Sequence, residues 1–248
     1  MLLQDKTAIV YGAAGQVGAA VADAFAREGA RVVLAGRTQH TLAKVADQIR
    51  DAGGAAQTAV VDVTDMAAMR VHAAEVAAAS GGIDIAFNAT ANDDLQGIPL
   101  LDMDLGDFAR PVSKAITAHF TIATVTARHM LGRGGVILAM GGGREAIPRL
   151  GGSHVAWSAL AGLCRQLAAE LGPRGIRVAW LLSPGSPDPG AGPGVATPGD
   201  RDEPADGTLI GRRPSYQEVA NAAVFAASDW AATMTATEIN LTGGVVID

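Results

Sequence analysis

The chain of 248 residues is poor in the residues that several common classes of protein require. Its one cysteine, Cys164, can form no disulfide within the chain, which is typical of a reducing compartment. The net charge of −6 indicates no basic surface for nucleic acid or an anionic membrane. Asp5 and Lys6 interrupt the N-terminus too early for a signal peptide, and no long uncharged apolar run indicates a membrane span. We therefore expect a cytoplasmic protein without nucleic-acid or membrane partners.

Tyrosine and lysine are also scarce, in a chain with only 4% aromatic residues. The tyrosines are Tyr11 and Tyr216, and the lysines are Lys6, Lys44 and Lys114. The stretch between Lys114 and Tyr216 therefore contains no phenol and no amine side chain for acid–base chemistry.

Hydrophobic residues make up 49% of the chain, enough for one large buried core. Short apolar runs predict strands at residues 8–10, 31–36, 56–63, 83–89, 135–140, 176–182 and 238–241. Helical spacing predicts helices from residue 17 to a stop at Gly29, and at 41–52, 65–80, 104–131, 153–171 and 217–228. Because strands alternate with helices, we expect a single α/β domain over residues 1–248, with a parallel sheet covered on both faces.

Residues 183–214 differ from the rest, because they hold most of the chain's 11 prolines and few large apolar residues. Such a segment buries little surface, so we expect a mobile loop. It follows a strand at the edge of the sheet where ligands bind in open α/β folds, which favours a lid over an insertion without a role.

A glycine-rich turn lies between the first strand and the first helix. Gly12, Gly15 and Gly18 follow the apolar run, and helical spacing begins at Val17. Glycine allows the backbone to approach a pyrophosphate, and the helix N-terminus supplies N–H groups and a positive dipole. This context favours nucleotide binding over an ordinary strand-to-helix turn.

Several stretches together resemble the short-chain dehydrogenase/reductase family over nearly the whole chain. They are residues 12–18, 33–37, 62–63, 83–89, 167–178, 184–185 and 218–244. The resemblance implies a Rossmann-type, doubly wound sheet of seven strands. It also implies a homotetramer or homodimer that packs the two long central helices and the C-terminal region.

The resemblance also implies a set of cofactor-binding residues. The pyrophosphate turn would be Gly12, Gly15, Gln16, Val17 and Gly18, with Gln16 standing where the middle glycine is usual. Tyr11 replaces a usual threonine. The remaining matched positions are Asp62 and Val63 for the adenine, Asn88 and Ala89 after the fourth strand, and Pro184 and Gly185.

Arg37 distinguishes between the two nicotinamide cofactors. Relatives that use NAD carry an acid after the second strand for the ribose 2′-hydroxyl, and none is present at Ala35, Gly36 or Arg37. A guanidinium suits a 2′-phosphate, so we predict NADP(H) rather than NAD(H). A solvated arginine at a helix start is the alternative interpretation.

The family's chemistry uses a tyrosine acid/base, a lysine four residues later, a serine and a helix asparagine. Counting along the matched helix places these at Ser153, Trp157, Gly141 or Gly142, and Ala115. Ser153 is thus the candidate catalytic residue, although a serine hydroxyl alone is a weak substitute for the phenol. Nearby polar residues, for which a structural or solvated role is favoured, are His119, Arg144, Glu145 and His154.

Trp157 has a further consequence at the position where the family has the lysine. An indole there is expected to crowd the nicotinamide ribose, so that the nicotinamide half of the cofactor binds weakly or differently.

Three functional classes remain open. The first is a divergent oxidoreductase that binds NADP(H) and acts on a small carbonyl, alcohol or enoyl substrate through a non-standard site. The second is a non-redox cyclase, isomerase or dehydratase, and the third is a pseudoenzyme that pairs with a partner subunit. The retained glycine turn and Arg37 favour nucleotide binding, while the replaced catalytic positions favour the second and third classes.

Overall fold

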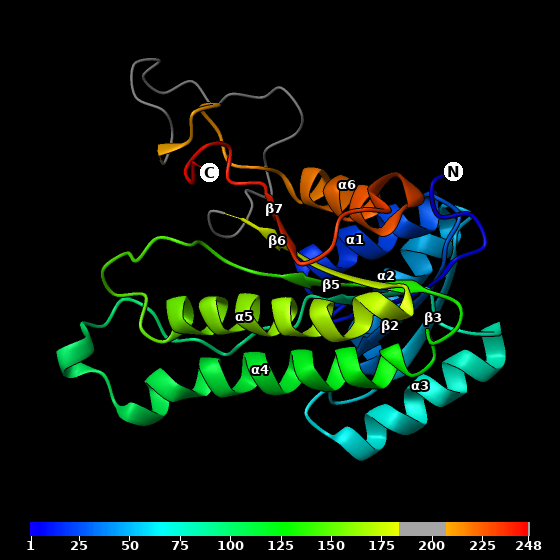
Figure 1. Cartoon of the computed structure of the whole chain (residues 1–248), viewed down its shortest axis with the longest axis horizontal. Helices are drawn as coiled ribbons and strands as arrows, with labels where there is room; N and C mark the ends of the chain where they lie inside the picture. The colour runs from blue at the N-terminus through cyan, green and yellow to red at the C-terminus, as the bar shows by residue number, and fades with distance from the viewer. Residues whose placement is uncertain (184–206, 248) are drawn as a thin grey trace.

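The computed structural model describes residues 1–183 and 207–247 and contains one seven-stranded sheet (Figure 1). The strands are β1 (Thr7–Tyr11), β2 (Arg31–Gly36), β3 (Ala55–Val60), β4 (Ile85–Asn88), β5 (Gly135–Met140), β6 (Ile176–Leu182) and β7 (Thr237–Asn240). Every pair of neighbours is parallel, and the order is β3-β2-β1-β4-β5-β6-β7. This order confirms the expected doubly wound Rossmann-type sheet.

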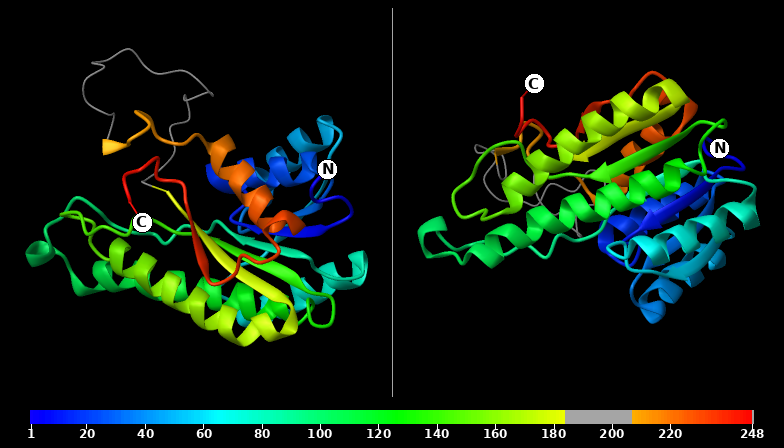
Figure 2. Two further views of the ribbon diagram at one scale, coloured as in Figure 1. Left: turned by 45° about the horizontal axis from the view of Figure 1, so that its top comes forward. Right: turned by 60° about the horizontal axis from the view of Figure 1, so that its bottom comes forward.

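Two layers of helices cover the sheet (Figure 2). The helices are α1 (Gln16–Arg27), α2 (Gln39–Asp51), α3 (Met66–Ser80), α4 (Leu105–Ala127), α5 (Ser153–Leu171) and α6 (Tyr216–Ala227). One hydrophobic core joins α1, α2 and α6 to the sheet, and the other joins α3, α4 and α5 to its opposite face. The cores occupy both faces because each crossover helix of a parallel sheet must bury its apolar side.

Local sequence signals fix the start of two helices. Asp65 caps α3 by accepting hydrogen bonds from the N–H groups of Ala67 and Ala68. Ser215 and Glu218 form a reciprocal capping box at α6. The ion pair with Arg212 lowers the pKa of Glu218 to about 2, so this box is ionised at neutral pH.

The long central helix is shorter than expected. The periodicity predicts residues 104–131, whereas α4 ends at Ala127 and the chain turns through Gly132 and Gly134, both with positive φ. Pro111 lies inside α4, and the helix continues through it. The third strand also ends earlier than expected, at Val60, and residues 61–63 line the cleft beyond it.

The expected mobile loop at 183–214 falls mainly on residues 184–206, outside the described part of the chain, so the lid stays a prediction. The described part of its C-terminal end joins the last turn of the protein, where the Ile210 N–H donates to the Gly243 carbonyl at 3.2 Å. Among the described residues, no helix is long and apolar enough to cross a membrane. A cytoplasmic location stays a prediction.

Candidate functional site

A cleft of about 320 Å³ opens at the carboxyl ends of β1, β2, β3 and β4. Six of the residues that the sequence singles out line it together: Gly12, Gly15, Arg37, Asp62, Val63 and Ala89. They come from four separate segments, and they meet because parallel strands end at the same edge of a sheet. Ligands of open α/β sheets bind in this position.

The glycines of the turn differ in how much space surrounds the position of a Cβ atom. A Cβ on Gly12 would lie 2.5 Å from the Ala89 carbonyl oxygen, and Gly12 has a φ of +78°. A Cβ on Gly18 would lie 2.3 Å from the Gly12 carbonyl oxygen. Gly15 has no such neighbour, since the nearest atom is 3.4 Å away, but it lines the cleft. Gly12 and Gly18 therefore shape the turn, and Gly15 leaves space for a ligand.

The N-terminus of α1 faces this turn without a side-chain cap. Gly15 is the N-cap residue, and no acidic residue lies in the first turn. The first N–H groups of a helix have no partner within the helix, so these donors and the helix dipole are suited to an anion. Gln16 is exposed here, while Val17 packs against the core and Gly18 is buried. None of these three lines the cleft with its side chain.

Arg37 stands at the outer end of the cleft, just after β2. Its side chain is exposed, and it makes no hydrogen bond or ion pair with the residues that the structure describes. Its charge contributes to the lowered pKa of Asp62, after the larger contribution of hydrogen bonds from Thr64. Asp62 is thus a carboxylate at neutral pH beside a guanidinium with free donors.

Lys114 is a cleft residue that sequence reasoning missed. It comes from α4, next to Ala115, and forms an ion pair with Asp93 that lowers the pKa of that carboxyl. A second cation therefore lines the cleft, from α4. The sequence did offer one signal for Lys114. It directly precedes Ala115, the position where the resemblance places the family's catalytic asparagine. The threonines of the cleft were missed too: Thr38, Thr41, Thr64 and Thr90.

Asn88 lies below the cleft and is buried. Its side-chain oxygen accepts hydrogen bonds from the Thr90 N–H and hydroxyl, and its amide nitrogen is 3.4 Å from Nδ1 of His119. The other ring nitrogen of His119 is 3.3 Å from Sγ of Cys164. Asn88 thus holds the Thr90 turn in place, while its neighbour Ala89 lines the cleft.

The side chains of His119 and Cys164, which are in contact and buried, are both uncharged at neutral pH. Complete burial lowers the pKa of His119 to about 4, and burial raises the pKa of the Cys164 thiol to about 12. This arrangement supports the structural interpretation of His119 and makes Cys164 its buried, unreactive partner.

Ser153 occupies the first position of α5, where the resemblance places the family's tyrosine. Its hydroxyl is buried and donates to the Asp94 carboxylate at 2.6 Å, and it accepts from the Gln96 amide at 3.0 Å. Gln96 in turn donates to Asp94 at 2.7 Å. The serine therefore ties α5 to the loop after β4, and it lines neither the cleft nor the cavity beside Trp157.

Trp157 and Gly142 fit together at two further positions of the family's catalytic set. A Cβ on Gly142 would lie 2.1 Å from Cε2 of the Trp157 indole. At Gly141 the nearest atoms are 3.3 Å and 3.4 Å away, in Leu181 and Trp180. The indole thus covers the place where a serine side chain at 142 would begin. Ala115 is buried on α4, and Pro184 and Gly185 lie outside the described residues.

Comparison with known proteins identifies the family. Residues 12–246 match a family model described as enoyl-(acyl carrier protein) reductase. An uncharacterized oxidoreductase of Bacillus subtilis is 31% identical, covering 98% of this chain and 92% of that protein. A D-threitol dehydrogenase of Mycolicibacterium smegmatis is 32% identical, covering 99% of this chain and 94% of that protein.

Solved structures give the same result. A dehydrogenase/reductase from Sinorhizobium meliloti aligns with a TM-score of 0.84 and 31% identity, over 99% of this chain and 96% of that one. A short-chain dehydrogenase from Burkholderia cenocepacia in complex with NADP aligns with a TM-score of 0.82 and 29% identity, over 99% of both chains. With its parallel seven-stranded sheet and glycine turn, the chain belongs to the short-chain dehydrogenase/reductase family.

Proposed function

We propose that the protein binds NADP(H) in the cleft at the carboxyl ends of β1–β4. The uncapped N-terminus of α1 beside Gly12 and Gly15 suits a pyrophosphate. Asp62 and Val63 stand at the matched adenine positions, and Asn88 and Ala89 support the inner wall. The donors and the bare glycine surface fit a dinucleotide, and the related Burkholderia structure holds NADP.

The free guanidinium of Arg37 is the single observation that carries the choice of NADP(H). A 2′-phosphate can accept two parallel hydrogen bonds from such a fork, whereas a ribose hydroxyl offers no charge. Lys114 faces the same cleft but is paired with Asp93, so Arg37 supplies the unneutralised cation. NAD(H) lacks the phosphate and is the weaker ligand in this proposal.

We further propose oxidoreductase activity on a small carbonyl, alcohol or enoyl substrate through a non-standard site. NADP(H) supplies or accepts the hydride when bound. The protein must then supply positioning and any proton transfer without a tyrosine or lysine from 115 to 215. Ser153, at the family's tyrosine position, is the candidate residue for that proton transfer, and its hydroxyl must turn from Asp94 toward the substrate to serve as a donor.

The packing of Trp157 on Gly142 specifically favours the alternative, a non-redox enzyme or an inactive partner subunit. The indole takes space beside the glycine loop, which is consistent with a nicotinamide half that binds weakly or in another position. In this alternative, the adenosine side of the cleft retains its ligand and the carbonyl chemistry is absent.

The deciding experiment is a calorimetric titration of NADPH and NADH into the protein and into Arg37→Ala. We expect NADPH to bind more tightly than NADH, and Arg37→Ala to weaken NADPH binding about 10- to 100-fold, since a hydrogen bond to a charged group contributes about 1.5–3 kcal/mol. Arg128→Ala, on an exposed arginine outside the cleft, is the matched control. Unchanged NADPH affinity in Arg37→Ala would refute the proposed role of this residue.

A double variant, Ser153→Tyr with Trp157→Lys, distinguishes the two candidate functions. Carbonyl reductase activity that appears only in this variant marks an otherwise intact reductase scaffold, in support of the alternative for the natural chain. Activity of the natural chain toward carbonyl or enoyl substrates with NADPH supports the first proposal. A partner protein that co-purifies at fixed stoichiometry supports a pseudoenzyme subunit.

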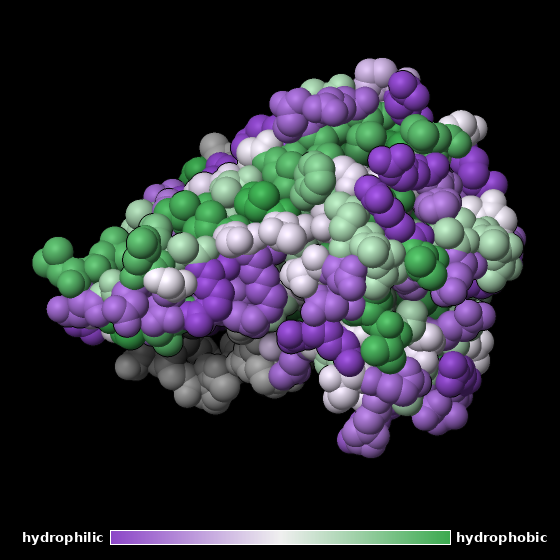
Figure 3. Space-filling view, turned by 90° about the horizontal axis from the view of Figure 1, so that it is seen from below, coloured by the Kyte–Doolittle hydropathy of each residue, from purple (hydrophilic) through white to green (hydrophobic). Residues whose placement is uncertain are grey.

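We also propose that the chain forms a homodimer or homotetramer through α4 and α5. Figure 3 shows hydrophobic residues gathered along the face that is seen from below. Exposed apolar side chains on these helices include Phe120 of α4 and Val155 of α5. Gly162 lies on the exposed side of α5, with open space around its Cβ position, so a second helix can approach closely there.

A further inference from the structure

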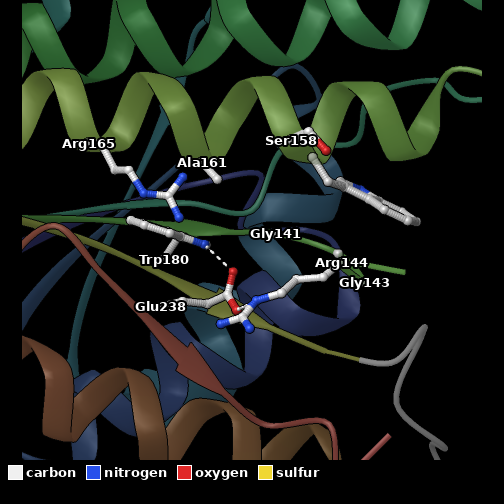
Figure 4. Close-up of a pocket in the computed structure, with 10 residues that line it drawn as sticks. Gly141, Gly143, Arg144, Ser158, Ala161, Arg165, Trp180 and Glu238 are labelled. Atoms are coloured by element: carbon white, nitrogen blue, oxygen red, sulfur yellow. Dashed lines mark hydrogen bonds and ion pairs between the residues drawn. The ribbon is translucent and has the colours of Figure 1, made fainter. Parts of the chain in front are cut away.

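A second cavity, of about 210 Å³, lies between α5, the loop after β5 and the last two strands, β6 and β7 (Figure 4). Its main side chains are Arg144, Trp157, Arg165, Trp180 and Glu238. It shares no lining residue with the nucleotide cleft. The cavity is thus separate from the residues that we assign to the adenine and pyrophosphate, and its Trp157 end lies on the nicotinamide side.

Two of the charged groups in the cavity neutralise each other. Glu238 accepts a hydrogen bond from Nε of Arg144 at 2.6 Å and another from Nε1 of Trp180 at 2.7 Å. In Figure 4, Arg144 reaches across from the loop to Glu238, and the dashed line marks the bond from Trp180. The Glu238 side chain is only 9% exposed, so its charge is held inside a satisfied network.

Arg165 is the charged residue of the cavity that takes no part in this hydrogen-bond network. It extends from α5 over Trp180, with its guanidinium carbon 4.9 Å from the ring centroid. It makes no hydrogen bond or ion pair with the described residues. Stacking occupies the face of a guanidinium and leaves its N–H groups, which lie in the plane, free to donate. The cavity thus presents an oriented cation that has no anionic partner in the part of the chain that the structure describes.

The lining of the cavity also includes two indole rings, Trp157 and Trp180, beside the charged groups. The Trp157 indole packs on Gly142, and the neighbouring Gly143 has no atom within 4 Å of its Cβ position. The loop therefore presents bare backbone at Gly143, next to the Trp157 indole. The volume is below the roughly 300–1,000 Å³ of pockets for drug-sized ligands, so it suits a body of one or two rings.

We propose that this cavity binds a small aromatic carboxylate. The carboxylate accepts hydrogen bonds from the Arg165 fork, and the ring lies against Trp157 and the glycine loop. A singly charged carboxylate matches the bidentate geometry of one guanidinium. A doubly charged phosphate is disfavoured, because Glu238 lies in the same cavity and, among the described lining residues, only Arg165 remains without an anion.

The test uses 1-naphthoate as the probe in calorimetric titrations of the full-length protein. We expect saturable binding at one site, weakened about tenfold or more by Arg165→Gln, because a charge-assisted hydrogen bond is lost. Arg128→Gln is the matched control, as an exposed arginine just after α4 and outside the cavity. Uncharged 1-naphthamide is expected to bind at least tenfold more weakly than 1-naphthoate.

A second variant tests the aromatic wall separately from the cation. Trp157→Leu is expected to weaken binding of 1-naphthoate while Arg165 is retained. The absence of saturable binding at millimolar 1-naphthoate, or equal affinity in Arg165→Gln, would overturn the proposal.

Discussion

At the scale of single residues, Trp157 and Gly142 behave as one unit, because the indole lies where a side chain at 142 would begin. We predict that Gly142→Ala destabilises the natural chain by about 1–3 kcal/mol through overpacking. In a Trp157→Ala background the same change is expected to cost much less, since the obstructing ring is gone. Urea unfolding of the two single variants and the double variant measures this coupling. Additive effects of the two changes would contradict the contact.

Gly15 and Gly18 provide a second residue-scale comparison, within one turn. A Cβ on Gly18 would meet the Gly12 carbonyl at 2.3 Å, whereas on Gly15 the nearest atom is 3.4 Å away. Gly18→Ala is therefore expected to lower the melting temperature and also nucleotide affinity. Gly15→Ala is expected to preserve the melting temperature and reduce only nucleotide affinity, because its Cβ enters the cleft. Equal losses of stability in both variants would be inconsistent with this assignment.

At the scale of elements, His119 joins α4 to β4 and α5 through Asn88 and Cys164. Burial lowers its pKa from 6.5 to about 4 in the folded chain. The unfolded chain therefore binds a proton at a higher pH than the folded chain, and stability that is present above pH 6.5 is lost as the pH falls toward 4. The loss amounts to at most about 3 kcal/mol from this one group.

The variant His119→Gln tests this contribution, because it removes the titrating ring and retains a polar group. We expect its free energy of unfolding to change less than that of the natural chain between pH 7 and pH 5, as measured by urea unfolding. Asp62 and Glu218 have lowered pKa values in both proteins, so their effect cancels in the comparison. The same pH dependence in both proteins would rule out this role of His119.

At the scale of the whole molecule, we predict that copies of the chain associate through the exposed sides of α4 and α5. Because Gly162 has open space at its Cβ position, Gly162→Glu is expected to leave a single folded chain intact. If α5 packs closely against its counterpart, the new side chain and charge must break that contact. Sedimentation analysis should then show a smaller assembly for Gly162→Glu than for the natural chain. Ala169→Glu, nearer the C-terminal end of α5, extends the test along the helix.

The sequence by itself determined the layers of the molecule and the place of the cleft. Alternation of apolar strands with helical spacing is a local signal, and parallel strands necessarily bring their carboxyl ends to one edge. Gly12, Arg37 and Asp62 each follow a strand, so their meeting could be foreseen. Element ends were less certain, as the early stop of α4 at Ala127 shows, because glycine turns compete with helical spacing there.

Only the tertiary structure decided how side chains meet across elements. Ser153 bonds Asp94 at a separation of 59 residues, and Arg144 bonds Glu238 at a separation of 94. No periodicity in either segment encodes such partners, since they depend on side-chain directions after helices and strands have packed. For the same reason, the pairing of Lys114 with Asp93 and the stacking of Arg165 on Trp180 emerged only from the fold.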